Sequence, residues 1–448
     1  MTATRGHTAA TTPSNSRDPH SPTYRNTYPH ETPSRSKQHS PLQVALLTGG
    51  GDKPYALGLT SALVSQGIMV DFIGSNEVNG PGLHTNPQVT FLNLRGDQRQ
   101  DASLPRKVFR VLAYYVHLLR YAALAKPKVF HVLWNNKFQL LDRTLLMLYY
   151  RSLRKRIVLT AHNVNAAKRD RTDSWLNRIS LRFQYRLAHH IFVHTGRMKT
   201  ELVSDFGVPE AKVSVIPFGI NDTVPDSGLT GPEARKLLGI DNHDKTILFF
   251  GYIAPYKGLE YLVAAMAKLT QQQGDYRLVI AGTPKRSAAY WHEIRERIAR
   301  SGIGARIIES IEYIPDCEVE WYFKAADALV LPYSDISQSG VLLLAYSFGL
   351  PVIAADVGSL RENIVQGETG FVFRAEDSND LAETIDTYFK SELYRGLENR
   401  RKAIRDYAGE RYSWSKVGEI TKNIYERLLA DGDARVIDTQ RLGWGRRG

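Results

Sequence analysis

Lys257 is the side chain in this sequence whose position best suits it for chemistry. It follows a short apolar strand pattern and a glycine turn, in the segment Phe249-Phe-Gly-Tyr-Ile-Ala-Pro-Tyr-Lys257-Gly258, and it precedes a helical pattern. The free N–H groups at the start of a helix attract anions, and the lysine charge would act on the same anion. The spacing therefore predicts a diphosphate-binding residue, whereas a lysine outside such a setting is more often a solvated surface residue.

A second segment with the same geometry follows a later strand. The strand pattern ends at Leu331, a polar loop comes next, and an apolar helical pattern starts near Ser339-Gly340 and stops at Gly349-Leu-Pro351. Small residues at the start of the helix would let a phosphate oxygen approach the backbone amides closely. The alternative interpretation is a buried helix with an ordinary N-cap.

The elements that must position these residues alternate between strand and helix along the chain. Apolar strand patterns occur at 42–47, 69–73, 129–133, 157–160, 191–194 and 213–216, and again at 246–250, 277–281, 328–331 and 351–354. Such alternation indicates parallel sheets that are covered on both faces. We predict an α/β protein with two Rossmann-like, doubly wound parallel-sheet domains that face a cleft, where ligands tend to bind.

The same patterns predict the domain boundaries. We expect a disordered tail at 1–40, a first Rossmann-like domain at 41–220, a linker at 221–244, a second domain at 245–412, a C-terminal helix at 413–430 that crosses back to the first domain, and a tail at 431–448. The tail at 1–40 is rich in Ser, Thr, Pro and His and has no apolar signal-peptide core.

Charge is distributed unevenly over these domains. Residues 41–220 contain 24 Lys and Arg against 11 Asp and Glu, whereas residues 221–448 contain 29 against 33. An anionic partner should therefore bind the first half. The cluster at 151–156 and the nearly apolar helix at 108–124 could contact an anionic membrane surface, or could be a solvated surface over a core helix. No nucleic-acid motif is present, and we expect no nucleic-acid partner.

The two segments described first resemble the nucleotide-sugar-binding domain of family GT4, the retaining glycosyltransferase group 1 enzymes with the GT-B fold. The similarity covers about residues 244–430 and includes Ala326-Asp327 and the late helix at Trp414. Less specific matches in the first half are Gly49–Gly51, Thr160-Ala-His162-Asn163 and Pro217-Phe-Gly-Ile220.

The resemblance implies roles for individual residues. Lys257 would hold the donor diphosphate, and His162 would lie at the reacting face. The remaining expected donor-binding residues are Gly50, Gly51, Gly251, Tyr252, Asp335, Gln338, Ser339, Gly340, Val341 and Glu362. Charge builds on the leaving phosphate as the sugar becomes oxocarbenium-like, so a preformed cationic site is the main requirement. We therefore expect no metal and no cofactor other than the nucleotide-sugar co-substrate.

The sequence also departs from the family pattern. Tyr252 replaces the usual arginine, and the usual pair of glutamates falls at Ile336 and Leu344. A carboxylate for the ribose hydroxyls is therefore lost, and only Asp335 or Gln338 could replace the one that faces the sugar.

The resemblance implies a glycosyltransferase that moves a sugar from a nucleotide-sugar donor to a saccharide or lipid-linked saccharide, with retention, in polysaccharide or glycolipid biosynthesis. The alternative is a non-catalytic homologue that binds a sugar nucleotide as a partner subunit. A dinucleotide oxidoreductase is disfavoured because Gly49–Gly51 does not open as G-x-G-x-x-G. The single cysteine, Cys317, and the lack of a long apolar segment favour a cytoplasmic location, at most peripheral on the cytoplasmic face of the membrane.

Overall fold

The computed structural model describes residues 41–443 except 50–51, 99–102, 137, 170–171, 221–223, 272–274 and 285–286. Only the backbone is described for residues 104, 169 and 431–443. The predicted tail at 1–40 and two predicted site residues, Gly50 and Gly51, therefore lie outside the described residues.

Seven parallel strands form the first sheet, in the order β3-β2-β1-β4-β5-β6-β7. They are β1 (Gln43–Leu47), β2 (Met69–Gly74), β3 (Val89–Asn93), β4 (Val129–Val132), β5 (Arg156–Thr160), β6 (His190–Val193) and β7 (Val213–Val215). The central strands are buried and largely apolar, with His131 in β4 and His190 in β6 as buried exceptions, as expected for a sheet covered on both faces. Leu47 is in register with Ile73 and with Val132, so neighbouring strands end at the same edge.

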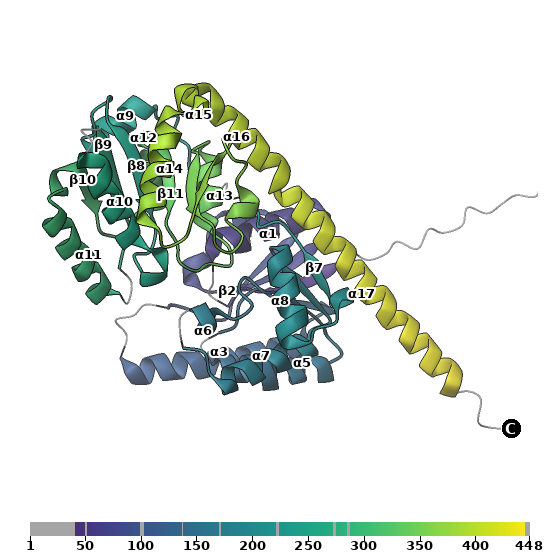
Figure 1. The fold of residues 1–448 in the computed structure, drawn as a ribbon. Helices are drawn as coiled ribbons and strands as arrows, with labels where there is room; N and C mark the ends of the chain where they lie inside the picture. Colours follow the sequence, from purple (N-terminus) through teal and green to yellow (C-terminus); the bar gives the residue numbers. More distant parts are fainter. Residues whose placement is uncertain are drawn as a thin grey trace, which may run out of the picture. The chain divides into compact units, whose positions relative to one another are not determined.

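Six parallel strands form the second sheet, in the order β10-β9-β8-β11-β12-β13. They are β8 (Lys245–Phe250), β9 (Tyr276–Ala281), β10 (Ile307–Ser310), β11 (Ala328–Leu331), β12 (Val352–Ala355) and β13 (Gly370–Phe373). Figure 1 shows helices interleaved with the strands of both sheets. The two parallel sheets confirm the predicted fold class.

Helices connect the strands in both domains. The first has α1 (Lys53–Ser65), η1 (Asn76–Val78), α2 (Gly82–Thr85), α3 (Leu104–Leu124), α4 (Gln139–Leu141), η2 (Asp142–Leu146), α5 (Met147–Ser152), α6 (Ala166–Arg169), α7 (Trp175–Leu187), α8 (Gly196–Phe206) and η3 (Glu210–Lys212). The second has α9 (Gly231–Leu238), η4 (Pro255–Lys257), α10 (Leu259–Gln271), α11 (Ala288–Ser301), η5 (Gly304–Arg306), α12 (Asp316–Ala325), α13 (Gly340–Ser347), η6 (Arg361–Asn363), α14 (Ser378–Lys390), α15 (Glu392–Arg395) and α16 (Leu397–Arg411).

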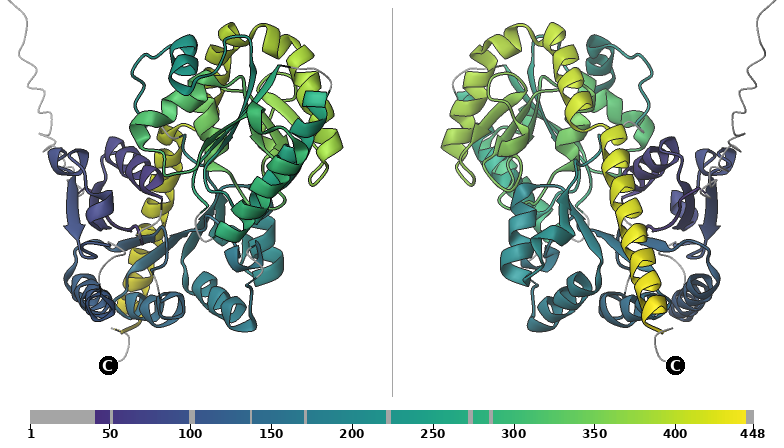
Figure 2. Two further views of the ribbon diagram at one scale, coloured as in Figure 1. Left: turned by 90° about the vertical axis from the view of Figure 1, so that its left-hand side faces the viewer. Right: turned by 90° about the vertical axis from the view of Figure 1, so that its right-hand side faces the viewer.

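The last helix, α17 (Trp414–Gly443), belongs to the first domain by its packing although it follows the second in sequence (Figure 2). Trp414 Nε1 donates to the Ile220 carbonyl at 2.9 Å. The Trp414 ring lies so close to Gly58 of α1 that a Cβ there would come within 2.2 Å of it. Val417 and Tyr425 are fully buried in the core that lies between α1 and the first sheet.

The structure differs from the sequence prediction in three places. The predicted linker at 221–244 contains α9, because Thr230 and Glu233 form a reciprocal capping box at its start and Gly239 ends it at φ +67°. Three further strands, β3, β10 and β13, were not predicted. The C-terminal helix continues through the predicted tail to Gly443, so residues 431–443 are helical.

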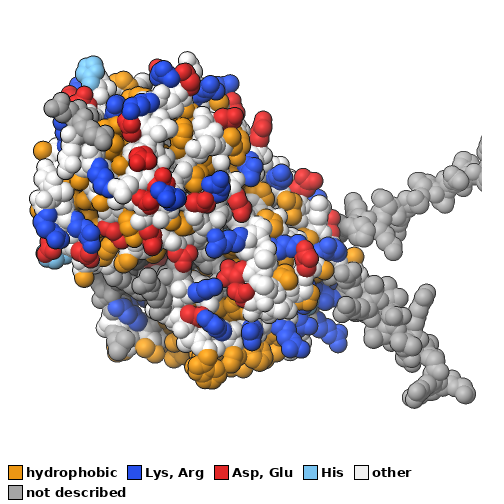
Figure 3. Space-filling view, in the orientation of Figure 1, with side chains coloured by type: hydrophobic (Ala, Val, Ile, Leu, Met, Phe, Trp, Pro, Cys, Tyr) orange, Lys and Arg blue, Asp and Glu red, His pale blue; other side chains and the backbone are white. Residues whose placement is uncertain are grey.

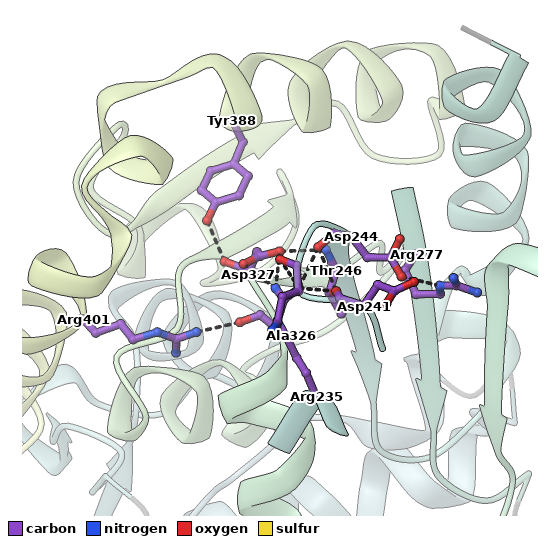
Figure 4. A network of polar contacts seen from close by, with 10 residues as sticks. Arg235, Asp241, Asp244, Thr246, Arg277, Ala326, Asp327, Tyr388 and Arg401 are labelled. Atoms are coloured by element: carbon purple, nitrogen blue, oxygen red, sulfur yellow. Dashed lines mark hydrogen bonds and ion pairs between the residues drawn. The ribbon is translucent and has the colours of Figure 1, made fainter. Parts of the chain in front are cut away.

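A polar network fixes the starts of the strands in the second domain, at the edge opposite the carboxyl ends (Figure 4). Arg235 of α9 contacts both carboxylate oxygens of Asp327 at 2.9 Å, and Thr246 N donates to the same carboxylate at 2.7 Å. Arg401 donates to the Ala326 carbonyl at 2.6 Å. Ala326-Asp327 therefore joins α9 and α16 to the sheet, which gives it a structural role.

We expect Arg235→Met to lower the free energy of unfolding by about 3 kcal/mol or more, because it leaves the buried Asp327 carboxylate without its cation. Urea unfolding of the purified protein measures this loss. The double variant Arg235→Met, Asp327→Leu should recover part of it. A loss below about 1 kcal/mol in the single variant would show that the ion pair behaves like an exposed one.

Candidate functional site

Lys257 ends η4 at the carboxyl end of β8 and is only 7% exposed. Its Nζ lies 2.5 Å from Tyr333 Oη and 4.1 Å from the centre of the Tyr333 ring. Gly258 follows at φ +63°, and a Cβ there would lie 1.9 Å from the Pro332 carbonyl oxygen. Glycine is therefore required for the loop after β11 to approach Lys257, which brings the two predicted segments together.

The start of α13 lies beside the turn after β8. Ser339 caps the helix, since its Oγ accepts from Leu342 N at 3.3 Å. Gly251 has φ +103°, and a Cβ there would lie 3.6 Å from Val341 Cγ2. The start of α13 thus borders one region together with Gly251 and Lys257, at the carboxyl ends of β8 and β11, as anion binding requires.

His162 lies after β5 inside a box of aromatic side chains. Its ring stacks on Trp134 at 4.2 Å with an interplanar angle of 5°, and its centroid is 4.6 Å from that of Tyr55. His162 Nδ1 lies 3.0 Å from His194 Nε2. Burial, together with the neighbouring His194, lowers the pKa of His162 well below its ordinary value. The imidazole is therefore neutral near pH 7.

Four buried polar atoms in this region have no hydrogen-bond partner among the described residues. Tyr55 Oη and Arg143 Nε belong to residues beside His162, and the other two atoms are His162 Nε2 in the first domain and Gln338 Oε1 in the loop before α13. Most buried polar side-chain atoms in proteins are satisfied, so exceptions need an explanation. His162 and Gln338 are residues that the sequence predicted for the site, and a bound polar substrate would satisfy their free atoms.

Phe218 joins the histidine box to the second domain. Its ring centroid is 4.9 Å from that of His194 and 6.0 Å from that of His162. Its Cε1 would lie 3.8 Å from a Cβ at Gly340, the first residue of α13. Phe218 therefore links His162, predicted to lie at the reacting face of the first domain, to α13, predicted to bind an anion in the second.

Two cavities adjoin these residues. A cavity of about 190 Å³ beside His162 is lined by polar side chains that include Asn135, Arg143 and Gln184. A second cavity, of about 310 Å³, has walls from both domains: the first contributes α8 and Lys168, and the second contributes the loop 335–337. Both cavities offer space for polar groups such as sugar hydroxyls.

The remaining predicted residues are less closely grouped. Tyr252 is half exposed in the turn after β8, and Asp335 is exposed at the edge of the larger cavity. Glu362 is exposed in η6, and only its backbone carbonyl, which accepts from Arg411 at 3.3 Å, has a described contact. Ile336 and Leu344, at the positions of the family's glutamate pair, are both buried.

Two known families match the chain. The family described as glycosyl transferases group 1 matches residues 244–391, and glycosyltransferase family 4 matches residues 49–224. The two matches cover both domains. The chain belongs to glycosyltransferase family 4. The resemblance inferred from the sequence is thereby confirmed.

Several curated relatives of this family 4 protein are glycosyltransferases. An uncharacterised glycosyltransferase of Methanocaldococcus jannaschii is 29% identical over 51% of this chain and 57% of its own length. A D-inositol 3-phosphate glycosyltransferase of Corynebacterium diphtheriae is 27% identical over 63% of this chain and 66% of its own length. The matched region is thus less than two thirds of each of these two relatives. The equivalent enzyme of Corynebacterium glutamicum is 24% identical over 88% of this chain and 96% of its own length.

Solved structures of glycosyltransferases share the fold. Sucrose-phosphate synthase of Thermosynechococcus elongatus matches with a TM-score of 0.70 and 20% identity over 87% of this chain and 100% of that structure. Anabaena HepE in complex with UDP and glucose matches with a TM-score of 0.67 and 16% identity over 86% of this chain and 100% of that structure. The predicted GT-B fold is confirmed.

Sequence reasoning missed the side chains that surround the two central residues. Tyr333 contacts Lys257, while Tyr55, Trp134 and His194 surround His162. Trp134 and His194 lie within two residues of the carboxyl ends of β4 and β6. Because side chains at the carboxyl ends of parallel strands meet at one edge, this position was the signal that could have identified them.

Proposed function

We propose that this protein transfers a sugar from a nucleotide-sugar donor to a saccharide or lipid-linked saccharide acceptor, with retention of configuration. The observation that carries the proposal is the convergence of Lys257 and the start of α13, with His162 across Phe218 from them. Polysaccharide or glycolipid biosynthesis in the cytoplasm is the setting that we propose for the reaction.

The anionic leaving group would be stabilised by the second domain. Lys257 carries a positive charge beside the amides of α13, so both act on the diphosphate as the bond to the anomeric carbon breaks. The contact from Tyr333 holds the ammonium group in place before the donor binds. Because these groups form a cationic site from protein alone, we propose that transfer needs no metal. EDTA treatment of the active protein tests this point.

The first domain would orient the sugar and the acceptor. A neutral His162 can accept or donate a hydrogen bond through Nε2, and the Trp134 and Tyr55 rings fix the orientation of the imidazole. The cavity of about 190 Å³ beside it would receive the polar part of the acceptor. His162 would thus act by hydrogen bonding at the reacting face.

Donor recognition would differ from the family pattern. Tyr252 supplies no charge to the diphosphate, so Lys257 and α13 would act without the usual arginine. Ile336 and Leu344 offer no carboxylate, whereas Gln338 Oε1 is buried and can accept a bond from a sugar hydroxyl. Ribose selection by a carboxylate is thereby lost.

Thermal stabilisation by sugar nucleotides tests the donor site. UDP-glucose belongs in the panel because HepE is solved with it, alongside GDP-, ADP- and dTDP-sugars. A donor at 100 times its dissociation constant adds about 2.7 kcal/mol of stability, which is visible as a raised melting temperature. We expect sugar nucleotides of one class to stabilise the protein. We also expect the protein to hydrolyse these donors or to transfer their sugar.

The outcomes separate the proposal from its alternative. Stabilisation without hydrolysis or transfer to saccharide, polyol phosphate or lipid-linked acceptors would support a non-catalytic partner subunit that binds a sugar nucleotide. Stabilisation by none of the panel would overturn the donor site altogether.

A further inference from the structure

Three helical segments form one layer against a face of the first sheet: α3, the continuous segment η2–α5, and α7. Tyr149 of α5 donates to the Leu119 carbonyl of α3 at 3.2 Å. Arg143 of η2 donates to Asn177 and Ser180 of α7 at 2.7 and 3.2 Å. The segments are thus held side by side, and their outer sides make one continuous surface.

The outer side of α3 is apolar although it faces solvent. Phe109 is 73% exposed, Leu112 57% and Val116 62%, while Tyr114 and Leu118 are buried against the sheet. The spacing of three and four residues places the exposed side chains on one stripe of the helix. A helix that needed only to cover the sheet would carry polar residues along that stripe.

The other two segments extend the apolar surface. Leu145 and Leu148 are exposed on η2–α5, and Trp175, Ile179 and Phe183 are exposed on α7. Figure 3 shows hydrophobic side chains gathered along the lower edge of the protein, where Figure 1 draws α3 and α7. Large continuous apolar surfaces of this kind mark interaction sites. We call the exposed apolar side chains of these three segments the docking face.

The charged side chains of the three segments are almost all positive, although Arg178 of α7 is paired with Asp173 at 2.6 Å. Residues 104–128, 139–156 and 175–189, which contain the three segments, include fourteen Lys and Arg but a single carboxylate, Asp142. Asp142 is buried, and it accepts from Tyr115 Oη at 2.8 Å and from Asn136 N at 2.5 Å. A second copy of the chain would bring like charges together, whereas an anionic surface would complement them.

We propose that the docking face binds the surface of a bilayer that contains anionic phospholipids. Its apolar side chains would enter the boundary between head groups and acyl chains, and the surrounding Lys and Arg would contact the head groups. None of the helices in the described residues is long and apolar enough to cross a bilayer, so this is a surface interaction. Arg143 and Gln184 of the same layer line the cavity beside His162, so a lipid-linked acceptor would reach that cavity from the bound surface.

Co-sedimentation of the full chain with vesicles tests this proposal. We expect binding to phosphatidylcholine vesicles that contain 30% phosphatidylglycerol, and at least tenfold weaker binding to phosphatidylcholine alone. The variant Phe109→Ser, Leu112→Ser should lose about tenfold or more in affinity, because two side chains no longer enter the bilayer. Leu237→Ser on α9 is the matched control, since Leu237 is also exposed, at 56%, but lies in the second domain.

Charge variants test the electrostatic part. Arg182→Gln, Arg186→Gln on α7 should weaken binding about fivefold for each charge, whereas Arg295→Gln on α11 should have no effect. Equal binding to both kinds of vesicle, or to neither, would overturn the proposal. So would a dimer in solution that Leu112→Ser dissociates.

The vesicle measurement uses no sugar nucleotide, although the purpose of docking rests on the proposed lipid-linked acceptor. If the protein bound the donor but no vesicles, only the docking proposal would be wrong. If it bound vesicles but no donor, only the proposed sugar transfer would be wrong.

Discussion

We expect Lys257→Met to lower kcat about 100- to 1000-fold, which is the range observed when one preorganised charge-stabilising group is removed from an active site. Methionine keeps most of the volume of the side chain, so the loop around Gly258 can stay closed. What is lost is the ammonium group that lies 2.5 Å from Tyr333 Oη beside the start of α13. Because charge develops on the leaving phosphate, the loss should appear in kcat and in kcat/KM for the donor.

A steady-state assay with the donor identified by thermal stabilisation measures this loss. Lys416→Met on α17 is the control, since that lysine is exposed and lies on the helix that packs against the first domain. Thermal melting without ligand shows whether the variant is folded. Unchanged turnover in a folded Lys257→Met variant would mean that the lysine is only a structural partner of Tyr333.

We expect the protein to lose stability steeply as the pH falls from 6.5 toward 4, because buried neutral histidines must stay unprotonated in the folded state. Burial lowers the pKa of His131 to about 3, and lowers that of His190 and of His194 to about 4. In the unfolded chain these histidines bind protons near pH 6.5. Their contribution to the free energy of unfolding is therefore fully present above that pH and is lost progressively below it. Each histidine contributes about 1.4 kcal/mol per pH unit, so the three together contribute about 4 kcal/mol per pH unit between the two pKa values.

A single variant isolates one of these contributions. The His131 ring lies 2.6 Å from Tyr425 Oη and 2.7 Å from Thr160 Oγ1, contacts that a glutamine can partly replace. In urea unfolding at pH 7, 6 and 5, the advantage of the wild type over His131→Gln should shrink by about 1.4 kcal/mol per pH unit below 6.5. Burial raises the pKa of Asp142 and of Asp327, which act in the opposite direction, but they are common to both proteins.

His292→Gln serves as the control for the pH series, because His292 is exposed on α11. The free energy of unfolding of this variant should change with pH as steeply as that of the wild type. If His131→Gln also kept that slope, the buried ring would be titrating as it does in the unfolded chain, and the expected acid sensitivity would have another origin.

The central strands could be predicted from sequence because each is a largely apolar run that is buried on both faces. Of the four edge strands, β7 was predicted at 213–216, but β3, β10 and β13 were not. In β3, Thr90 and Asn93 are exposed, and in β10 the exposed residue is Glu309, so neither reads as a buried run. The strand β13 starts with Gly370, which breaks the pattern further. Edge strands pair on one side only and tolerate polar residues, so periodicity alone identifies them poorly.

The candidate site was predictable where a motif fixes the backbone and not where side chains meet across the fold. Strand, glycine turn and helix patterns located Lys257 and the start of α13. The contact of Lys257 with Tyr333 joins residues 76 positions apart, and the stack of His162 on Trp134 joins two different strand ends. Such contacts depend on the order of strands in the sheet, which the spacing of residues along the chain does not encode.

The packing of α17 has a consequence for synthesis on the ribosome. The core between α1 and the first sheet is completed by Val417, Ile424 and Tyr425, about two hundred residues after β7. At roughly 5–20 residues per second, those residues are made roughly 10–40 s after the first sheet is complete. During that interval the nascent first domain exposes the apolar surface that α17 later covers. A segment synthesised after the whole second domain therefore sets when the first domain can finish folding and cover the apolar surface on which chaperones and aggregation act.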